Sequence, residues 1–377
     1  MSLKTIEKKV LSNKRLTPDD ALSLFQSDDL FTIGRLANHA AHRKNSSNAY
    51  FIKNHHINPT NICVNRCKFC AFSRSKGEKG AYEMSIAKIV NKLKKAGGQR
   101  GKGIEAQRIS LPFSEVHIVG GLHPEWSLQH YIEMLGSIKK NFPDLHIKAF
   151  TAVEIDYLAK LSGLSLKGTL LALKMAGLDT MPGGGAEIFS PQVRKKICPE
   201  KITGHRWLQV MQAAHETGIR TNATMLYGHL EKDVHRVDHL LKLRDLQDKT
   251  GGFQAFIPLA FHPKNTSIEG AAYTSGIDDI KTIAISRLFL DNFDHIKAYW
   301  IMLGKKIAQL ALTFGADDLD GTIIEEKITQ SARALSGMAM TQTELVNMIE
   351  KAGKVAVERD SFYKPIKIRK PLPVALK

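Results

Sequence analysis

The segment Asn61-Ile-Cys-Val-Asn-Arg-Cys-Lys-Phe-Cys70 places three of the chain's four cysteines within eight residues. It follows a strand predicted at residues 55–60, so the three thiols share one short loop. Thiolates in this arrangement bind zinc, an electron-transfer iron–sulfur cluster, or a four-iron cluster with one iron left open. Structural zinc sites usually combine Cys-x2-Cys with a second pair, and only Cys198 remains outside the loop. The spacing therefore favours a cluster that lacks one protein ligand.

Short strand-like runs alternate with longer amphipathic segments over most of the chain. Helical periodicity is clear at residues 126–140 and 235–247. Eight strands are predicted, at residues 55–60, 115–120, 147–152, 179–183, 220–226, 253–259, 297–302 and 310–314. Repeated βα units indicate parallel strands with right-handed crossovers. Eight such units predict an α/β fold closed into a (β/α)8 barrel of the TIM type.

An open doubly wound sheet is the rival architecture. It would carry a Gly-x-Gly-x-x-Gly turn after an early strand, and Gly183-Gly-Gly185 does not have that spacing. No internal repeat or Ser/Pro-rich linker divides the chain. We therefore predict a helical extension at residues 1–50, a barrel core at 51–320, and C-terminal helices with a basic tail at 321–377.

The amino-acid composition limits the class of protein but does not identify its function. Of 377 residues, 43% are hydrophobic and 24% charged, which suits a globular fold with a sizeable core. Lys and Arg outnumber Asp and Glu by 54 to 37, giving a formal charge of +17. That charge is compatible with a basic iron–sulfur protein acting on RNA, but the excess lies in scattered lysines and the tail rather than among aromatic residues. A zinc-binding module without enzymatic activity is a third class.

The chain has no obvious targeting segment. No apolar run approaches the roughly 20 residues that a membrane span needs, and the first residues lack the apolar stretch of a signal peptide. Few cysteines, most of them clustered, argue for metal binding in a reducing compartment. We expect a cytoplasmic protein that binds no nucleic acid and has no membrane span.

The cysteine loop matches the Cys-x3-Cys-x-aromatic-Cys signature of the radical S-adenosylmethionine superfamily, with Phe69 as the aromatic residue. The resemblance implies a [4Fe-4S] cluster held by Cys63, Cys67 and Cys70, with S-adenosylmethionine on the open iron. In that superfamily an electron from the cluster splits the sulfonium into methionine and a 5′-deoxyadenosyl radical. Cys198 is then expected to be a buried, apolar-like thiol.

Further stretches resemble cofactor-binding motifs of the superfamily. Gly120-Gly121 resembles the glycine motif that binds the methionine ammonium, a role that suits glycine because backbone must approach the ligand closely. The stretch from Gly228 to Glu231 resembles a Gly-x-x-Glu motif near the adenosyl group. Glu187, after three glycines, is a candidate ligand for the adenosyl ribose. The alternative roles are an ordinary turn for the glycines and a helix start for the acids.

Longer stretches narrow the resemblance to the menaquinone futalosine-pathway enzymes and the related deazaflavin synthase subunits. They lie at Asn61 to Arg74, His117 to Pro124, Pro182 to Glu187, Thr224 to His229, Gly251 to Pro263 and Gly315 to Thr322. Within this branch, the His262-Pro-Lys-Asn-Thr266 pattern is similar to the aminofutalosine synthases. Dehypoxanthine futalosine cyclases usually carry Gln-Pro at that place.

The resemblance implies a radical transferase that forms a carbon–carbon bond in menaquinone biosynthesis. The 5′-deoxyadenosyl radical would add to the enol-ether double bond of 3-[(1-carboxyvinyl)oxy]benzoate, and loss of the carboxylate would give 6-amino-6-deoxyfutalosine. S-Adenosylmethionine is then a co-substrate. The reaction also implies an electron donor such as flavodoxin or ferredoxin.

The two carboxylates of that substrate need donors in a dry pocket. His262, His229 and Asn222 are the substrate-side candidates, although a histidine at a strand end more often packs than reacts. His56 and His123 are similar cases. The basic, glycine-rich segment Ala96 to Phe113 is expected to be a solvated loop, with a partner-binding role as the alternative.

Overall fold

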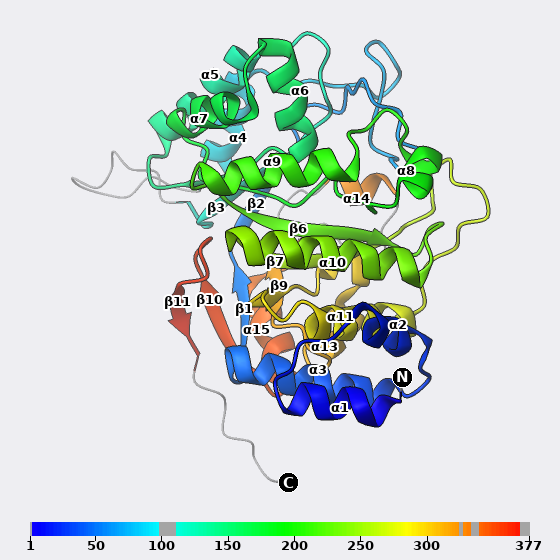
Figure 1. Cartoon of the computed structure of the whole chain (residues 1–377). Helices are drawn as coiled ribbons and strands as arrows, with labels where there is room; N and C mark the ends of the chain where they lie inside the picture. Colours follow the sequence, from blue (N-terminus) through cyan, green and yellow to red (C-terminus); the bar gives the residue numbers. More distant parts are fainter. Residues whose placement is uncertain (1, 98–110, 324–326, 333–338, 370–377) are drawn as a thin grey trace.

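The computed structural model describes residues 2–97, 111–323, 327–332 and 339–369. Within these residues, seven parallel strands form a curved sheet whose spatial order follows the chain (Figure 1). The strands are β2 (Asn54–Ile57), β3 (Glu115–Ile118), β4 (His146–Ala149), β5 (Thr180–Met181), β6 (Arg220–Tyr227), β7 (Phe253–Ala260) and β8 (His295–Ile296). Parallel neighbours in chain order require a crossover after each strand, as the βα pattern predicts.

A second sheet of four strands adjoins the seven-stranded sheet. Its order is β11-β10-β1-β9, with bounds β1 (Asn48–Ile52), β9 (Asp318–Gly321), β10 (Val355–Arg359) and β11 (Pro365–Ile368). β9 runs parallel to β1, which leads through Lys53 into β2. A parallel bridge joins Lys297, directly after β8, to Asp318 of β9. The predicted α/β barrel is therefore confirmed, with β9 linking the two ends of the curved sheet.

The last two predicted strands are wrong. A strand was expected at residues 297–302, but the observed strand, β8, ends at Ile296 and is followed by α12 (Trp300–Leu303). The strand expected at residues 310–314 belongs to the end of α13 (Lys305–Ala311) and the turn after it, where Phe314 N–H donates to Ala311 O at 2.9 Å. A short apolar run fits a buried helical turn as well as a strand. The eighth barrel strand is instead β9, a polar segment.

Helices follow most strands and cover the outside of the parallel sheet (Figure 1). They are α4 (Ile86–Ala96), α5 (Leu128–Asn141), α6 (Ala152–Ser162), α7 (Leu166–Met175), α8 (Pro191–Ile197), α9 (Gly204–Glu216), α10 (Asp233–Thr250) and α11 (Gly276–Phe289). Most begin after a Ser or Thr whose side chain accepts a first-turn N–H, as Thr151 does for α6. The amphipathic segments predicted at 126–140 and 235–247 correspond to α5 and α10.

The three N-terminal helices are α1 (Leu3–Leu11), α2 (Pro18–Gln26) and α3 (Leu30–Asn45). Two of them, α2 and α3, pack against the barrel helices α10 and α11, and α1 packs on α2 and α3, at the bottom of Figure 1. Their contact residues include Leu24 and Leu36, whose side chains are fully buried. The extension is thus integrated into the apolar core.

The C-terminal part contains strands that the sequence analysis did not predict. After α14 (Ile328–Ser331) and α15 (Gln342–Lys351), β10 pairs in parallel with β1, and β11 pairs antiparallel with β10. Residues 370–377 of the predicted basic tail, and residues 98–110 of the predicted insertion, lie outside the described residues. The three-part division of the chain stays a prediction.

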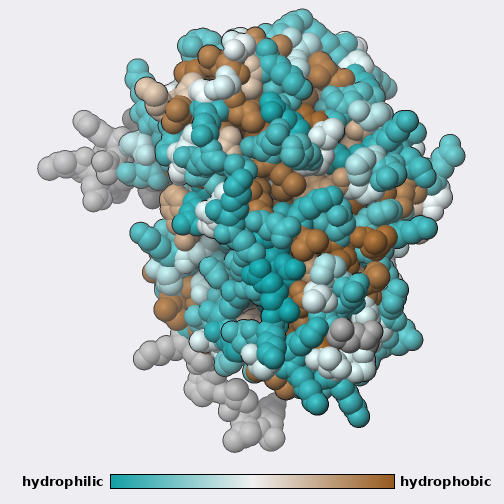
Figure 2. All heavy atoms as spheres, viewed as in Figure 1, coloured by the Kyte–Doolittle hydropathy of each residue, from teal (hydrophilic) through white to brown (hydrophobic). Residues whose placement is uncertain are grey.

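The surface seen in Figure 2 is mostly hydrophilic, with smaller apolar areas between polar ones. Among the described residues, no helix is both long enough and apolar enough to cross a membrane. The carboxyl ends of the parallel strands, with the loops that follow them, meet at one end of the barrel. Catalytic groups of α/β barrels lie at that end.

Candidate active site

The cysteine loop leaves the end of β2 and folds back on itself. Cys63 N–H donates to Arg74 O at 3.1 Å, and Arg74 N–H donates to Asn61 O at 2.8 Å. The far end of the loop is tied down by Lys68 N–H, which donates to Ile197 O at 2.8 Å. These backbone bonds hold the three free, half-buried thiols at the strand ends.

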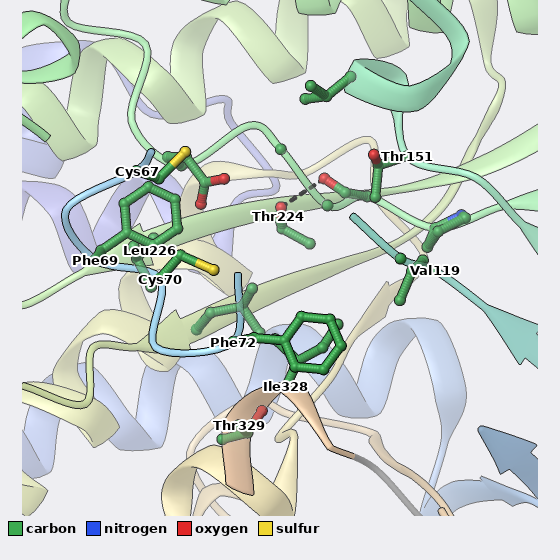
Figure 3. A pocket seen from close by; sticks show the side chains of 18 of the residues that line it. Cys67, Phe69, Cys70, Phe72, Val119, Thr151, Thr224, Leu226, Ile328 and Thr329 are labelled. Atoms are coloured by element: carbon green, nitrogen blue, oxygen red, sulfur yellow. Dashed lines mark hydrogen bonds between the residues drawn. The ribbon is translucent and has the colours of Figure 1, made fainter. Parts of the chain in front are cut away.

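All three thiols line one cavity of about 330 Å³ inside the barrel mouth. Figure 3 shows Cys67, Phe69 and Cys70 on a single turn of the loop, facing a wall that includes Thr151 and Val119. On that wall Thr224 Oγ1 donates to Gly183 O at 2.6 Å, the bond drawn as a dashed line. The cavity is bounded by sulfur on one side and by strand ends on the other.

The donor set fits an iron–sulfur cluster. Among the described residues, no three His, Cys, Asp or Glu side chains are grouped closely enough to hold a single metal ion. A four-iron cluster does not need such convergence, because each thiolate binds a different iron. Burial raises the pKa of Cys63, and it raises the pKa of Cys67 to about 12. Thiolates at this site therefore need a compensating positive group, which iron supplies.

Glycine at position 121 is required by the packing of the cysteine loop. A Cβ on Gly121 would lie 2.7 Å from the carbonyl carbon of Ile62 and 3.0 Å from Cys63 Cβ. Gly121 N–H also donates to Thr60 O at 3.0 Å. At Gly120 the restriction is milder, since an added Cβ would lie 3.2 Å from Thr60 O. Both glycines line the cavity, and their role toward the methionine ammonium stays a prediction.

Glu154 is a cavity residue that the sequence analysis did not select. Its Oε1 accepts the Gly120 N–H at 3.2 Å, and its Oε2 accepts the Thr151 N–H at 2.7 Å. Burial raises the pKa of this carboxyl to about 7 in spite of these hydrogen bonds. The capping pattern Thr-x-x-Glu directly after a strand is the sequence signal that would have found it.

Glu187 lies in the cavity beside a lysine. Lys201 Nζ donates to Glu187 Oε1 at 2.5 Å, and the same ammonium lies 4.9 Å from the ring centroid of Phe69. Burial alone would lower the pKa of Lys201, but the nearby Glu187 and Cys67 raise it. The predicted Glu187 and Phe69 are therefore brought together with the cysteines, through a cation that the sequence analysis missed. The role of Glu187 toward ribose stays a prediction.

His229 and Glu231 are not among the residues that line the cavity. Glu231 accepts N–H groups from Gly228 at 2.6 Å and His229 at 2.9 Å, and pairs with Arg236 at 2.8 Å. His229 Nδ1 accepts Leu230 N–H at 2.7 Å. Both side chains thus stabilise the turn after β6. Their predicted roles toward cofactor and substrate stay predictions.

Asn222 and His262 do line the cavity. Asn222 is a buried residue of β6. His262 Nε2 donates to Met302 O at 2.9 Å, and its buried Nδ1 has no hydrogen-bond partner. Because Nε2 carries the proton in that bond, Nδ1 of the neutral ring is a hydrogen-bond acceptor, and no protein group donates to it. Of the three substrate-side candidates, these two are in a position to contact a ligand.

The remaining predicted residues have structural positions. His123 Nε2 lies 2.8 Å from Glu83 Oε2 and its ring stacks on Trp126. Cys198 is 1% exposed within the apolar core, as expected. His56, named with the substrate-side histidines, lines the cavity together with His117, Lys148 and Lys297, which the sequence analysis did not select.

Comparisons with known proteins agree with this geometry. Residues 57–243 match the family model "Radical SAM superfamily", and residues 250–372 match "CofH/MqnC C-terminal region". The chain is 42% identical to aminodeoxyfutalosine synthase of Thermus thermophilus, over 96% of this chain and 95% of that protein. It is also 39% identical to the 5-amino-6-(D-ribitylamino)uracil–L-tyrosine 4-hydroxyphenyl transferase of Methanopyrus kandleri, over 90% of each chain.

Solved structures share the fold at low sequence identity. Methylornithine synthase superposes with a TM-score of 0.72 at 17% identity, covering 93% of this chain and 96% of that one. The hydrogenase maturase HydG from Carboxydothermus hydrogenoformans gives a TM-score of 0.69 at 16% identity, covering 96% of this chain and 80% of that one. These likenesses support the barrel architecture alone.

Proposed function

The chain belongs to the radical S-adenosylmethionine superfamily, and on this premise we propose that it is an aminodeoxyfutalosine synthase of menaquinone biosynthesis. It is a radical enzyme of the transferase class whose cofactors are a [4Fe-4S] cluster and S-adenosylmethionine. The proposed acceptor is 3-[(1-carboxyvinyl)oxy]benzoate, and the proposed product is 6-amino-6-deoxyfutalosine. The observation that carries the proposal is a single cavity lined by three thiols and by several buried hydrogen-bond donors.

Cys63, Cys67 and Cys70 would hold the cluster. When bound, the cluster supplies the electron that breaks a carbon–sulfur bond of S-adenosylmethionine. The absence of a side chain at Gly121 lets the cysteine loop pack against the end of β3, which fixes where the cofactor must lie. The Lys201–Glu187 pair adds opposite charges beside Cys67, suited to the zwitterionic methionine part.

Radical addition to a double bond needs position and a dry site rather than a base. The inner wall between the strand ends is apolar, with Val119, Leu226, Ile257 and Leu259 lining the cavity; we call these four residues the apolar belt. An apolar lining excludes water from a reactive carbon radical. The amide of Asn222 is the donor proposed to orient the substrate near the belt, and His262 borders the same cavity.

The second candidate is the 4-hydroxyphenyl transfer between L-tyrosine and 5-amino-6-(D-ribitylamino)uracil. It is favoured by a similar level of identity, 39–40% over 90–96% of this chain, to several methanogen enzymes. The His262-Pro-x-Asn-Thr pattern favours the first candidate. Both candidates use the same cofactors, so only the products separate them.

Product identification tests the proposal. Anaerobically reconstituted protein is incubated with S-adenosylmethionine, a reductant, and either the enol-ether benzoate or the tyrosine and ribitylaminouracil pair. A nucleoside covalently coupled to the benzoate supports the proposal, and the Cys63→Ala variant should give none. Unchanged enol ether beside free 5′-deoxyadenosine refutes it, and a 4-hydroxyphenyl adduct of the uracil would establish the second candidate.

The physiological reductant and the cellular location stay predictions. A flavodoxin or ferredoxin is proposed as electron donor, in the cytoplasm. Turnover with each purified donor in place of a chemical reductant is the direct test of the first point.

A further inference from the structure

The cavity does not end at the cysteines and the apolar belt. It continues down the barrel to a group of buried polar side chains: His56, His117, Lys148 and Lys297 with the acids Glu115 and Asp320. We call these six residues the barrel floor. None of them takes part in the roles assigned above.

Strand register places three donors of the barrel floor side by side. His56 of β2 is paired with His117 of β3, and His117 is paired with Lys148 of β4. All three line the cavity, so they project inward from neighbouring strands at one level. The two imidazole rings are 4.6 Å apart, edge to face. The result is a row of nitrogen donors across a curved wall.

The acids of the barrel floor are already engaged. Lys148 Nζ donates to Glu115 Oε2 at 2.6 Å, and Lys297 Nζ donates to Asp320 Oδ1 at 3.2 Å. Burial would raise the pKa of Glu115 and Asp320, but the lysines lower both below the ordinary value. Within each ion pair the carboxylate neutralises the ammonium. An ammonium group has three N–H donors, so each lysine keeps N–H donors that its ion pair does not use.

The imidazoles, by contrast, lack partners. His56 Nε2 and His117 Nε2 are buried and form no hydrogen bond with any described residue. Burial lowers the pKa of His117 to about 4 and that of His56 well below its ordinary value, so both rings are neutral. A buried ring nitrogen without a partner is costly in a folded protein. Both residues line the cavity, and a neutral imidazole that carries its proton on the nitrogen nearer the ligand can donate to a group that accepts hydrogen bonds.

The order of groups along β3 and the residues that follow it gives the orientation of that ligand. Glu115 and His117 belong to the barrel floor, Val119 to the apolar belt, and Gly121 contacts the cysteine loop. His117 lies within β3, and Val119 and Gly121 follow the strand toward the cysteine loop. A ligand that reaches from the radical to the barrel floor must therefore have a reactive end, an apolar middle and an acceptor at the far end.

We propose that the barrel floor is the binding site for the ring carboxylate of an aryl carboxylate substrate, with His56 and His117 as the direct donors. A carboxylate is an acceptor-only group with two oxygens, which matches two adjacent N–H donors backed by two ammonium groups. The benzene ring then lies in the apolar belt, and the enol ether points toward the cysteine loop. This inference rests on the proposed function, whose substrate carries such a carboxylate.

Substrate truncation combined with substitution at the barrel floor tests the inference. The reconstituted enzyme is assayed with 3-[(1-carboxyvinyl)oxy]benzoate and with the analogue that has hydrogen in place of the ring carboxylate. The wild type is expected to prefer the dicarboxylate in kcat/KM by about 10- to 100-fold, the range for one hydrogen bond to a charged group. His117→Ala and His56→Ala should lose most of this preference through KM, and His117→Gln, which keeps a donor, should recover part of it.

His130→Ala is the matched control. His130 Nε2 is also buried without a partner, but the residue lies on α5 and does not line the cavity. Reductive cleavage of S-adenosylmethionine without acceptor shows that each variant is folded and loaded. If both His variants keep the wild-type preference, the barrel floor inference is overturned while the proposed function stands. If the wild type converts neither compound, the proposed function fails and the inference fails with it.

Discussion

Replacing Gly121 by alanine tests whether the end of β3 fixes the cysteine loop. The new Cβ would lie 2.7 Å from the carbonyl carbon of Ile62, whereas ordinary contacts begin at 3.4 Å, so the peptide must retreat by at least 0.7 Å. Overpacking of this kind costs about 1–3 kcal/mol. A misplacement of about 1 Å next to a reacting group costs on the order of a hundredfold in rate. We therefore expect Gly121→Ala to lower cluster content and to slow S-adenosylmethionine cleavage about a hundredfold.

A graded series of glycine variants makes the test specific. Gly120→Ala, with its new Cβ at 3.2 Å from Thr60 O, should be mildly affected. Gly136→Ala is the control, because nothing lies within 4 Å of a Cβ there and alanine favours the interior of α5. Iron and sulfide content, 5′-deoxyadenosine release and Tm are measured for all three. Full cluster content and wild-type cleavage in Gly121→Ala would refute the reasoning.

Other predictions concern thiols and buried charges. Alanine at any one of the three loop cysteines should abolish S-adenosylmethionine cleavage, while Cys198→Ala should retain it; a cluster-free Cys198→Ala protein would contradict the ligand assignment. Burial raises the pKa of Glu154 from 4.5 to about 7, so the folded protein holds a proton that the unfolded chain releases, and stability should fall by up to about 3 kcal/mol as pH rises through this window. Glu154→Gln should flatten that dependence in denaturant titrations of cluster-free protein. Lys201→Met leaves the carboxylate of Glu187 buried without its partner and should cost about 3–5 kcal/mol of unfolding free energy. Adding Glu187→Gln should restore part of this loss, and strict additivity would contradict the pairing.

Sequence periodicity predicted the barrel because six short strand-like segments alternate with longer helical ones. It failed at β9, where Asp318-Leu-Asp-Gly321 closes the barrel with acidic residues. Asp318 is neutralised by Arg359 of β10 at 2.7 Å, a partner 41 positions away. A strand whose polarity is compensated by distant residues has no local signal.

The candidate site was predicted where a short motif defines it. The cysteines, Phe69 and the glycine pair line the cavity, because one loop and one strand end position them. The barrel floor was missed because its residues come from separate strands and are polar at positions that usually carry core side chains. The alternation of Glu115 and His117 on β3 was the available clue, since alternate residues of a strand face the same side.

The central claim is that three thiolates hold a four-iron cluster whose open iron binds S-adenosylmethionine. The most direct measurement is electron–nuclear double resonance on the reduced cluster with S-adenosylmethionine labelled at the amino nitrogen and the carboxylate oxygens. We predict hyperfine coupling to both labels, lost when any one of Cys63, Cys67 or Cys70 is replaced. Absence of coupling in a fully loaded wild-type protein, or a fourth protein ligand on the cluster, would contradict the claim.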